Sequence, residues 1–194
     1  MTSAVAFSFF QAGFMDSPTR LASIPRLEAG ESKTVAVTAS FNKDIFDTVG
    51  MIPLTGEIVA DYVSRNRPAR QSFPVAYNLH DKNALTWDDD QKVGAFITPT
   101  DSLLKYYTGF VRQSAANFVL ESFSEPLQVG AQLYYGLKEL GCLYQVDPTS
   151  PFTRAQGDPL VVDTISLPRD TLVGGTGDCD DLTVLYCSLL EAAG

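Results

Sequence analysis

Residues 174–182 read GGTGDCDDL, and this stretch decides how the second half of the chain folds. The glycines suit a tight turn, and apolar residues then recur at helical spacing up to residue 193. Cys179 therefore stands at the expected start of a helix. A thiol in that position faces unpaired backbone N–H groups and the positive end of the helix dipole, which favour the nucleophilic thiolate.

Three aspartates beside Cys179 act in the opposite direction. Asp178, Asp180 and Asp181 suit a helix start, but their charges raise the pKa of a neighbouring thiol, so the net shift stays open. The expected position of Cys179, at an exposed helix tip, makes it a candidate nucleophile. The alternative is a buried structural thiol, and Cys187 fits that description better.

The helix expected over residues 179–193 carries an apolar stripe that should face a core. The stripe consists of Leu182, Leu185, Tyr186, Leu189, Leu190 and Ala193. A buried helix that ends the chain predicts that the parent protein continues beyond residue 194.

Two more helices are expected before this one. The first follows Pro99, with Thr100 or Asp101 as its cap and apolar positions between residues 103 and 119. The second opens at residues 124–126, where a serine cap precedes an early proline, and closes at Gly141.

Residues 142–175 carry several prolines and short apolar pieces. They predict an ordered loop that leads into the cysteine turn.

The first hundred residues alternate between apolar and polar with a period of two, which is typical of half-buried antiparallel strands. The alternation is clear over residues 5–9, 35–41, 58–62 and 73–79. Pro74 places the last of these strands at a sheet edge. Turns expected near residues 28–31, 53–56 and 66–68 complete a pattern of roughly seven strands. The sequence thus predicts an α+β protein, with an immunoglobulin-like β-sandwich over residues 1–100 and a helical domain over residues 101–194.

Composition excludes several functions. Lys and Arg number 14 against 23 Asp and Glu, a net charge of −9, whereas nucleic-acid binding needs clustered cations. The three cysteines lack the spacing of a metal site or a disulfide framework. The glycine run lacks the lysine of a phosphate-binding loop. We expect no nucleic-acid partner, metal or cofactor.

Three other features have ordinary interpretations. Residues 4–15 are apolar but interrupted and too short to cross a membrane, so no transmembrane segment is expected. Asp88, Asp89 and Asp90 follow Trp87 and indicate a solvated turn, because they lack the spacing of a calcium loop. His80, the single histidine, is expected at the end of a strand, in a surface or capping role.

Residues 177–182, GDCDDL, resemble the GDC(D/E)DL signature of bacterial transglutaminase-like proteins. The resemblance extends to LPRDTL at 167–172, YQVDP at 144–148 and LLEAAG at 189–194, so it covers residues 101–194. More loosely, the front portion, including residues 81–90, is similar to the β-domain that precedes this core in some bacterial envelope-associated proteins.

The resemblance implies a papain-like fold in which Cys179 is the nucleophile. Cys179 would attack a glutamine carboxamide or a peptide carbonyl, and its own backbone N–H would help to hold the oxyanion. Asp181 would support the helix start. The implied partner is a protein or peptide substrate, and the implied location is the periplasm or cell envelope.

The sequence departs from this family because no histidine follows Cys179. We therefore expect a fragment that is inactive alone, with the completing histidine about 30 to 50 residues beyond residue 194 in the parent and an aspartate after it. Its uncovered apolar surface predicts pairing with a second copy. The alternative function is a noncatalytic module that binds a peptide or protein.

Overall fold

The computed structural model describes residues 5–24, 30–35, 38–64, 67–119, 121–146, 158 and 161–194. It is an α+β protein, and the chain divides into two compact units, Met1–Lys82 and Asn83–Gly194. The sequence predicted this division after residue 100, but the structure places it between residues 82 and 83.

Residues 84–96 belong to the second unit because they share its strands and its core. Strand β5 (Ala84–Thr86) pairs antiparallel with β7 (Val162–Thr164), and the 3-10 helix η2 (Asp90–Phe96) follows β5. Phe96 is buried in a cluster with Leu85, Ile165 and Val184. The change to helical periodicity after Pro99 marks a change of secondary structure within this unit.

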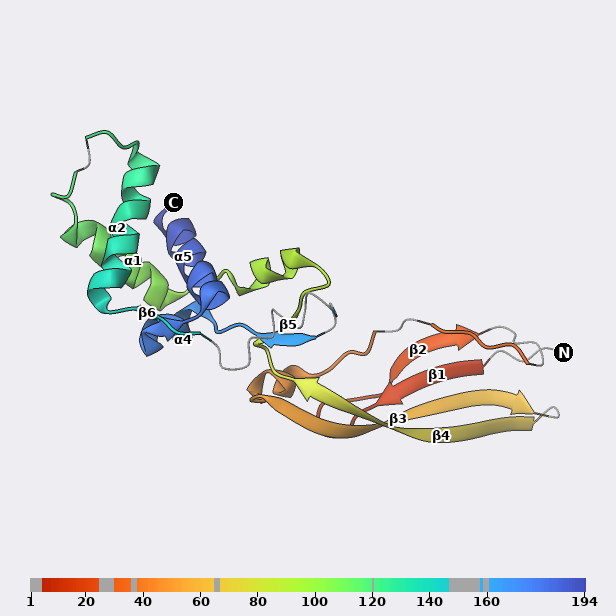
Figure 1. Ribbon diagram of the computed structural model, residues 1–194. Helices are drawn as coiled ribbons and strands as arrows, with labels where there is room; N and C mark the ends of the chain where they lie inside the picture. Colours follow the sequence, from red (N-terminus) through yellow and green to blue (C-terminus); the bar gives the residue numbers. More distant parts are fainter. Residues whose placement is uncertain are drawn as a thin grey trace. The chain divides into compact units, whose positions relative to one another are not determined.

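The first unit contains a four-stranded antiparallel sheet in the order β2-β1-β3-β4 (Figure 1). The elements of this unit are β1 (Val5–Phe10), β2 (Thr19–Ile24), the 3-10 helix η1 (Lys43–Asp47), β3 (Met51–Ser64) and β4 (Arg67–His80). Strands β1, β3 and β4 confirm the strands predicted at residues 5–9, 58–62 and 73–79. Strand β4 lies at the sheet edge, as Pro74 predicted.

The turn predicted at residues 53–56 is wrong, because these residues lie inside β3 and pair with β4. In the described part of the chain, β1 pairs with β3 over Glu57 to Asp61, so Pro53 lies outside the part of β3 that needs an N–H for β1. Position 56 needs a glycine because the ring of Phe9 packs against it. A Cβ at Gly56 would lie 2.4 Å from Cε2 of Phe9.

The strand predicted at residues 35–41 also differs from the structure. Residues 35 and 38–41 belong to no strand, and residues 36–37 lie outside the described part. Phe41 instead packs edge-on against Phe9, with ring centroids 6.5 Å apart. The described residues of this unit form one sheet, where the predicted sandwich needs two.

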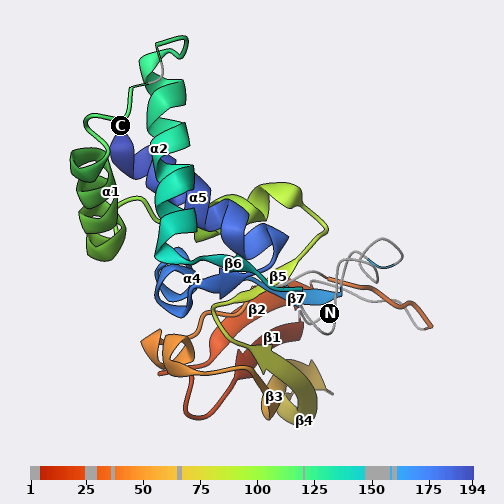
Figure 2. The same ribbon diagram turned by 60° about the vertical axis from the view of Figure 1, so that its left-hand side comes forward.

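In the second unit, the helices α1 (Ser102–Ser114), α2 (Glu125–Leu140) and α5 (Cys179–Ala193) pack against one another (Figures 1 and 2). Their shared core consists of Leu104, Val111, Leu133, Leu137, Leu172, Leu185 and Leu189. Glycines on α2 allow close approach. The hydroxyl of Tyr186 on α5 donates to the carbonyl of Gly130 at 2.9 Å, and a Cβ at Gly136 would lie 2.8 Å from Cγ2 of Val111 on α1.

Capping residues set the helix ends much as the sequence predicted. The side chain of Asp101 accepts hydrogen bonds from the backbone N–H groups at the start of α1, which selects it over Thr100. Helix α1 ends at Ser114, short of the apolar positions that continue to residue 119. Helix α2 begins after Ser124, as predicted, but the side chain of Ser124 makes no capping hydrogen bond; the helix ends at Gly141, whose φ of 87° is left-handed. Helix α5 has the predicted bounds.

The buried face of α5 includes two residues outside the predicted stripe, Val184 and Ser188. Val184 packs against Phe96, and the Ser188 hydroxyl accepts from the backbone N–H of Thr98 at 3.0 Å. The sequence missed them because the segment that covers this face was assigned to another domain.

The loop predicted over residues 142–175 contains regular structure in its described part. Strand β6 (Leu143–Tyr144) pairs in parallel with β8 (Thr176–Gly177), and helix α4 (Pro168–Gly174) precedes β8. Residues 147–157 and 159–160, with three of the four prolines on which the prediction rested, lie outside the described residues. Pro168 opens α4, a position at which a helix tolerates proline.

Candidate functional site

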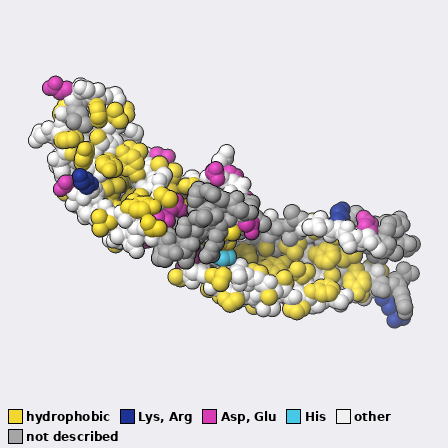
Figure 3. Space-filling view, viewed as in Figure 1, with side chains coloured by type: hydrophobic (Ala, Val, Ile, Leu, Met, Phe, Trp, Pro, Cys, Tyr) yellow, Lys and Arg dark blue, Asp and Glu magenta, His cyan; other side chains and the backbone are white. Residues whose placement is uncertain are grey.

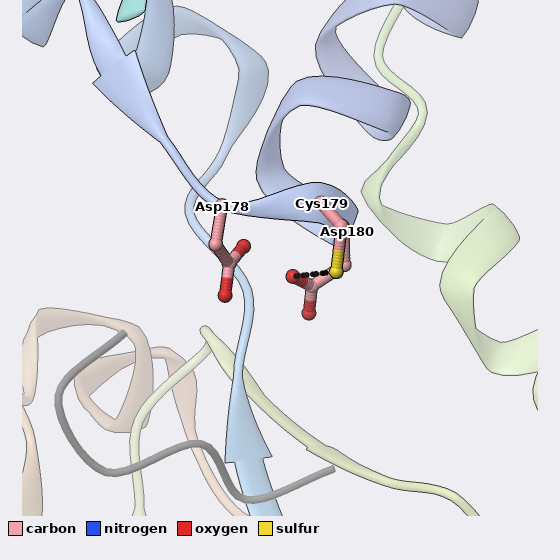
Figure 4. Close-up of side chains that lie close together, drawn as sticks. All are labelled: Asp178, Cys179 and Asp180. Carbon is pink, nitrogen blue, oxygen red and sulfur yellow. Dashed lines mark hydrogen bonds between the residues drawn. The ribbon is translucent and has the colours of Figure 1, made fainter. Parts of the chain in front are cut away.

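Cys179 is the first residue of α5, and its side chain is exposed. Asp178 caps the helix, because its Oδ1 accepts from the backbone N–H of Asp181 at 3.3 Å. The thiol of Cys179 lies beside the carboxylate of Asp180, with Sγ 3.9 Å from Oδ1 (Figure 4). The structure thus brings the predicted nucleophile to an exposed helix tip among two carboxylates.

The turn that presents Cys179 is held from two sides. Strand β6 supports it, because the backbone N–H of Gln145 donates to the carbonyl of Gly177 at 2.9 Å. Helix α4 ends directly before it at Gly175, whose φ of 68° is left-handed. Gly177 has no room for a side chain, since a Cβ there would lie 2.7 Å from Cβ of Asp181. The glycines of the quoted stretch therefore position the start of α5.

Asp181 connects α5 to the segment before α4. Its Oδ1 accepts from the backbone N–H of Ser166 at 2.7 Å. Burial raises the pKa of Asp181, although the hydrogen bond from Ser166 acts against this. Ser166 is a contact that the sequence did not reveal, because it lies fifteen residues before its partner and has no local motif.

Burial and charge make the thiol of Cys179 a weaker acid. Although Cys179 is exposed, partial burial of its thiol raises its pKa most, the charges of Asp180 and Asp178 raise it further, and backbone N–H groups lower it. The balance that the sequence left open therefore favours the protonated thiol.

Asp180 is itself perturbed, with its pKa raised to about 7. Burial is the main cause, followed by the hydrogen bond and charge of Asp178, with a smaller contribution from Asp163 on β7. Asp180 is therefore partly protonated at neutral pH, whereas an ordinary aspartate is fully charged.

Three side chains at the site carry atoms of the kind that ligate metal ions. One ligand atom from each of Asp178, Cys179 and Asp180 lies within 4.8 Å of the others. Acidic groups often gather at helix starts without an ion. We assign no metal to this group.

The other residues singled out in the sequence lie elsewhere. Asp89 caps η2, and Asp88 forms an ion pair with Lys92. His80 ends β4 in the first unit, and residues 83–194 contain no histidine. Cys142 and Cys187 are half-buried in the second unit.

Two hollows lie near the start of α5. One is a polar cleft of about 320 Å³ lined by Asp178 and Asp181 together with the ends of β6, β7 and β8. The other is a largely apolar groove of about 620 Å³. Its lining residues are Tyr134, Leu137, Lys138, Cys142, Tyr144, Leu182, Thr183, Tyr186 and Cys187. Both volumes lie in the range of ligand sites.

No family model, curated protein or solved structure matches the chain. Within the described residues, no helix combines the length and the apolar character needed to span a membrane.

Proposed function

We propose that Cys179 is the nucleophile of a transglutaminase-like unit that acts on peptide or glutamine amide bonds. The observation that carries the proposal is the exposed thiol at the first residue of α5, next to Asp178, which lines a cleft of about 320 Å³. The resemblance of residues 177–182, GDCDDL, to the GDC(D/E)DL signature also supports it.

The chemistry is acyl transfer through a thioester. Sγ of Cys179 loses its proton to a base and bonds to the carbonyl carbon of the amide, while the C–N bond breaks and the nitrogen leaves with a proton. Water or an amine then attacks the thioester and restores the thiol. The backbone N–H of Cys179 lies in the first turn of α5, where such groups have no partner within the helix, so it can stabilise the oxyanion.

The base is the missing component. Residues 83–194 supply no histidine, and the pKa of Cys179 is raised, so little thiolate forms at neutral pH. General-base catalysis is worth about 10² to 10⁴ in rate. We therefore propose that amide turnover by this chain alone is very slow, and that the base comes from outside this unit.

The raised pKa of Cys179 also supports a second candidate function, a noncatalytic module that binds a peptide or protein. A protonated thiol beside two carboxylates is a poor nucleophile, whereas the apolar groove along α2 and α5 is open to a ligand. In this case, Cys179 would only help to shape the helix start.

An activated acyl donor separates the two candidates, because its leaving group needs no proton. We expect the p-nitrophenyl ester of N-acetylglycine to transfer its acyl group to Cys179, with a burst of p-nitrophenol and a matching mass increase on the peptide that contains residue 179. The Cys179→Ser variant should lose the burst. An acyl group that reaches Cys142 or Cys187 at the same rate as Cys179 would refute the nucleophile proposal and leave the binding module.

A further inference from the structure

The apolar groove lies between the C-terminal half of α2 and the middle of α5, and we call it the α2–α5 groove. Tyr134 and Tyr144 stand on its walls, each 60 % exposed. Figure 3 shows hydrophobic side chains gathered over the helices of the second unit. Exposed aromatic walls around a hollow of about 620 Å³ are typical of a site that receives a bulky apolar group.

One charge distinguishes this groove. Lys138 is the only charged side chain among the described residues that line it. Lys138 is exposed and forms no salt bridge with a described residue; its Nζ lies 6.0 Å from the ring centroid of Tyr135. An exposed lysine beside an apolar groove favours a ligand that carries an anionic group.

The groove also adjoins the start of α5. Thr183 lines it, and the hydroxyl of Thr183 donates to the backbone carbonyl of Cys179, one helical turn away. The groove therefore reaches a residue one helical turn from the proposed nucleophile. Cys142 and Cys187 line the same groove, whereas Cys179 does not.

We infer that the α2–α5 groove binds a peptide segment in which a bulky apolar side chain stands next to a carboxylate. The apolar side chain fills the space between the tyrosines, and the carboxylate pairs with Lys138. That the ligand is a peptide rests on the proposed function, since Thr183 in the groove is one helical turn from the thiol proposed to act on peptide amides. Binding of this peptide segment in the groove would make the reaction of Cys179 selective for substrates that contain such a sequence.

The test uses the full chain with Cys179→Ser, so that no acyl transfer consumes the ligand. Three peptides differ only in charge: acetyl-Leu-Phe-Glu-amide, acetyl-Leu-Phe-Gln-amide and acetyl-Leu-Phe-Lys-amide. Binding is measured as protection of Cys142 and Cys187 from iodoacetamide, quantified by mass spectrometry. We expect saturable protection of both thiols, with the Glu peptide binding about fivefold more tightly than the Lys peptide at low salt and this ratio falling as salt is added.

Two variants on adjacent residues of α2 sharpen the result. Lys138→Glu should reverse the order of the Glu and Lys peptides. Glu139→Gln should leave the order unchanged, because Glu139 lines a separate hollow between α1 and α2. Circular dichroism checks that α2 remains folded in both.

Equal affinity for all three peptides, or an unchanged order in Lys138→Glu, would overturn the inference. Protection that appears without peptide as the protein concentration rises would also overturn it, because a second copy would then occupy the groove. Neither outcome depends on acylation of Cys179, so the inference can fail while the nucleophile proposal stands.

Discussion

The acidity of Cys179 depends on a competition within one turn of helix. The free N–H groups at the start of α5 favour the thiolate, while burial and the charges of Asp180 and Asp178 favour the thiol, and the second group of effects is stronger. Asp180 is the neighbour closest to the sulfur that the structure identifies, at 3.9 Å. Its charge is therefore the most direct way to change the reactivity of Cys179.

Replacement of Asp180 by asparagine should activate the thiol. Asp180→Asn removes a like charge, so the pKa of Cys179 should fall and its alkylation by iodoacetamide at pH 7 should accelerate about threefold. The pH profile of the alkylation rate should shift to lower pH. Asp170→Asn, an equal charge change at an exposed position in α4, should leave both quantities unchanged. An unaltered profile in Asp180→Asn would contradict this account of the pKa.

The same carboxyl should make stability depend on pH. The pKa of Asp180 is about 7 in the folded chain and about 4 in an unfolded one, so the folded state retains a proton between these values. The free energy of unfolding should therefore fall as the pH rises from about 4 to about 7, and this contribution should be constant above that range. Burial is the main cause of the raised pKa of Asp180, and the charges of Asp178 and Asp163 add to it.

Urea unfolding at pH 5 and pH 8 measures this effect. The wild-type chain should lose more stability between these values than Asp180→Asn, which has no proton to release. Equal losses in the two proteins would show that Asp180 titrates normally.

At the scale of elements, two glycines in neighbouring helices should respond oppositely to the same change. Gly136→Ala places a Cβ 2.8 Å from Val111, whose branched side chain is buried and stiff. Overpacking of this kind costs about 1–3 kcal/mol, more than the gain of about 1 kcal/mol in helix propensity. Gly109 on α1 has nothing within 4 Å of an added Cβ, so Gly109→Ala should stabilise by about 0.5–1 kcal/mol.

Thermal unfolding of the two variants gives the comparison directly. A higher melting temperature for Gly109→Ala and a lower one for Gly136→Ala are expected. A higher melting temperature for both would show that α1 and α2 are not in close contact at Gly136.

The elements that the sequence predicted well are those with local signals. Helix α2 has an early proline and a closing glycine, and α5 follows a glycine turn, so these bounds depend on residues within one turn of them. Pro53 and Gly56 misled because the same residue types serve both turns and strands. A strand at residues 53–56 can be told from a turn only by the position of Phe9 and the extent of β1, and both depend on the tertiary structure.

At the scale of the whole molecule, the boundary between the units follows from pairing across a long stretch of chain. β5 and β7 are about eighty residues apart, so no local pattern could assign β5 to the second unit. The candidate site likewise has features that depend on local sequence and features that depend on tertiary packing. The position of Cys179 could be predicted from its turn, whereas the contact between Asp181 and Ser166 and the α2–α5 groove exist only once α2, α4 and α5 have packed.

Two shorter chains test the boundary. Residues 83–194 should fold with a cooperative transition of their own, because they retain the β5–β7 pair and the buried Phe96. Residues 101–194 should be much less stable, since Val184 and Ile165 lose the residues that cover them. Urea unfolding followed by circular dichroism compares them. Equal stability would contradict the boundary at Lys82.

The proposal that Cys179 is an exposed nucleophile position is tested most directly by competition among the three cysteines. The native chain is treated with a limiting amount of iodoacetamide at pH 7.5, and the label on each thiol is measured by mass spectrometry. We expect Cys179 to react first, because it is exposed while Cys142 and Cys187 are half-buried. Faster labelling of Cys187 than of Cys179 would contradict the proposal.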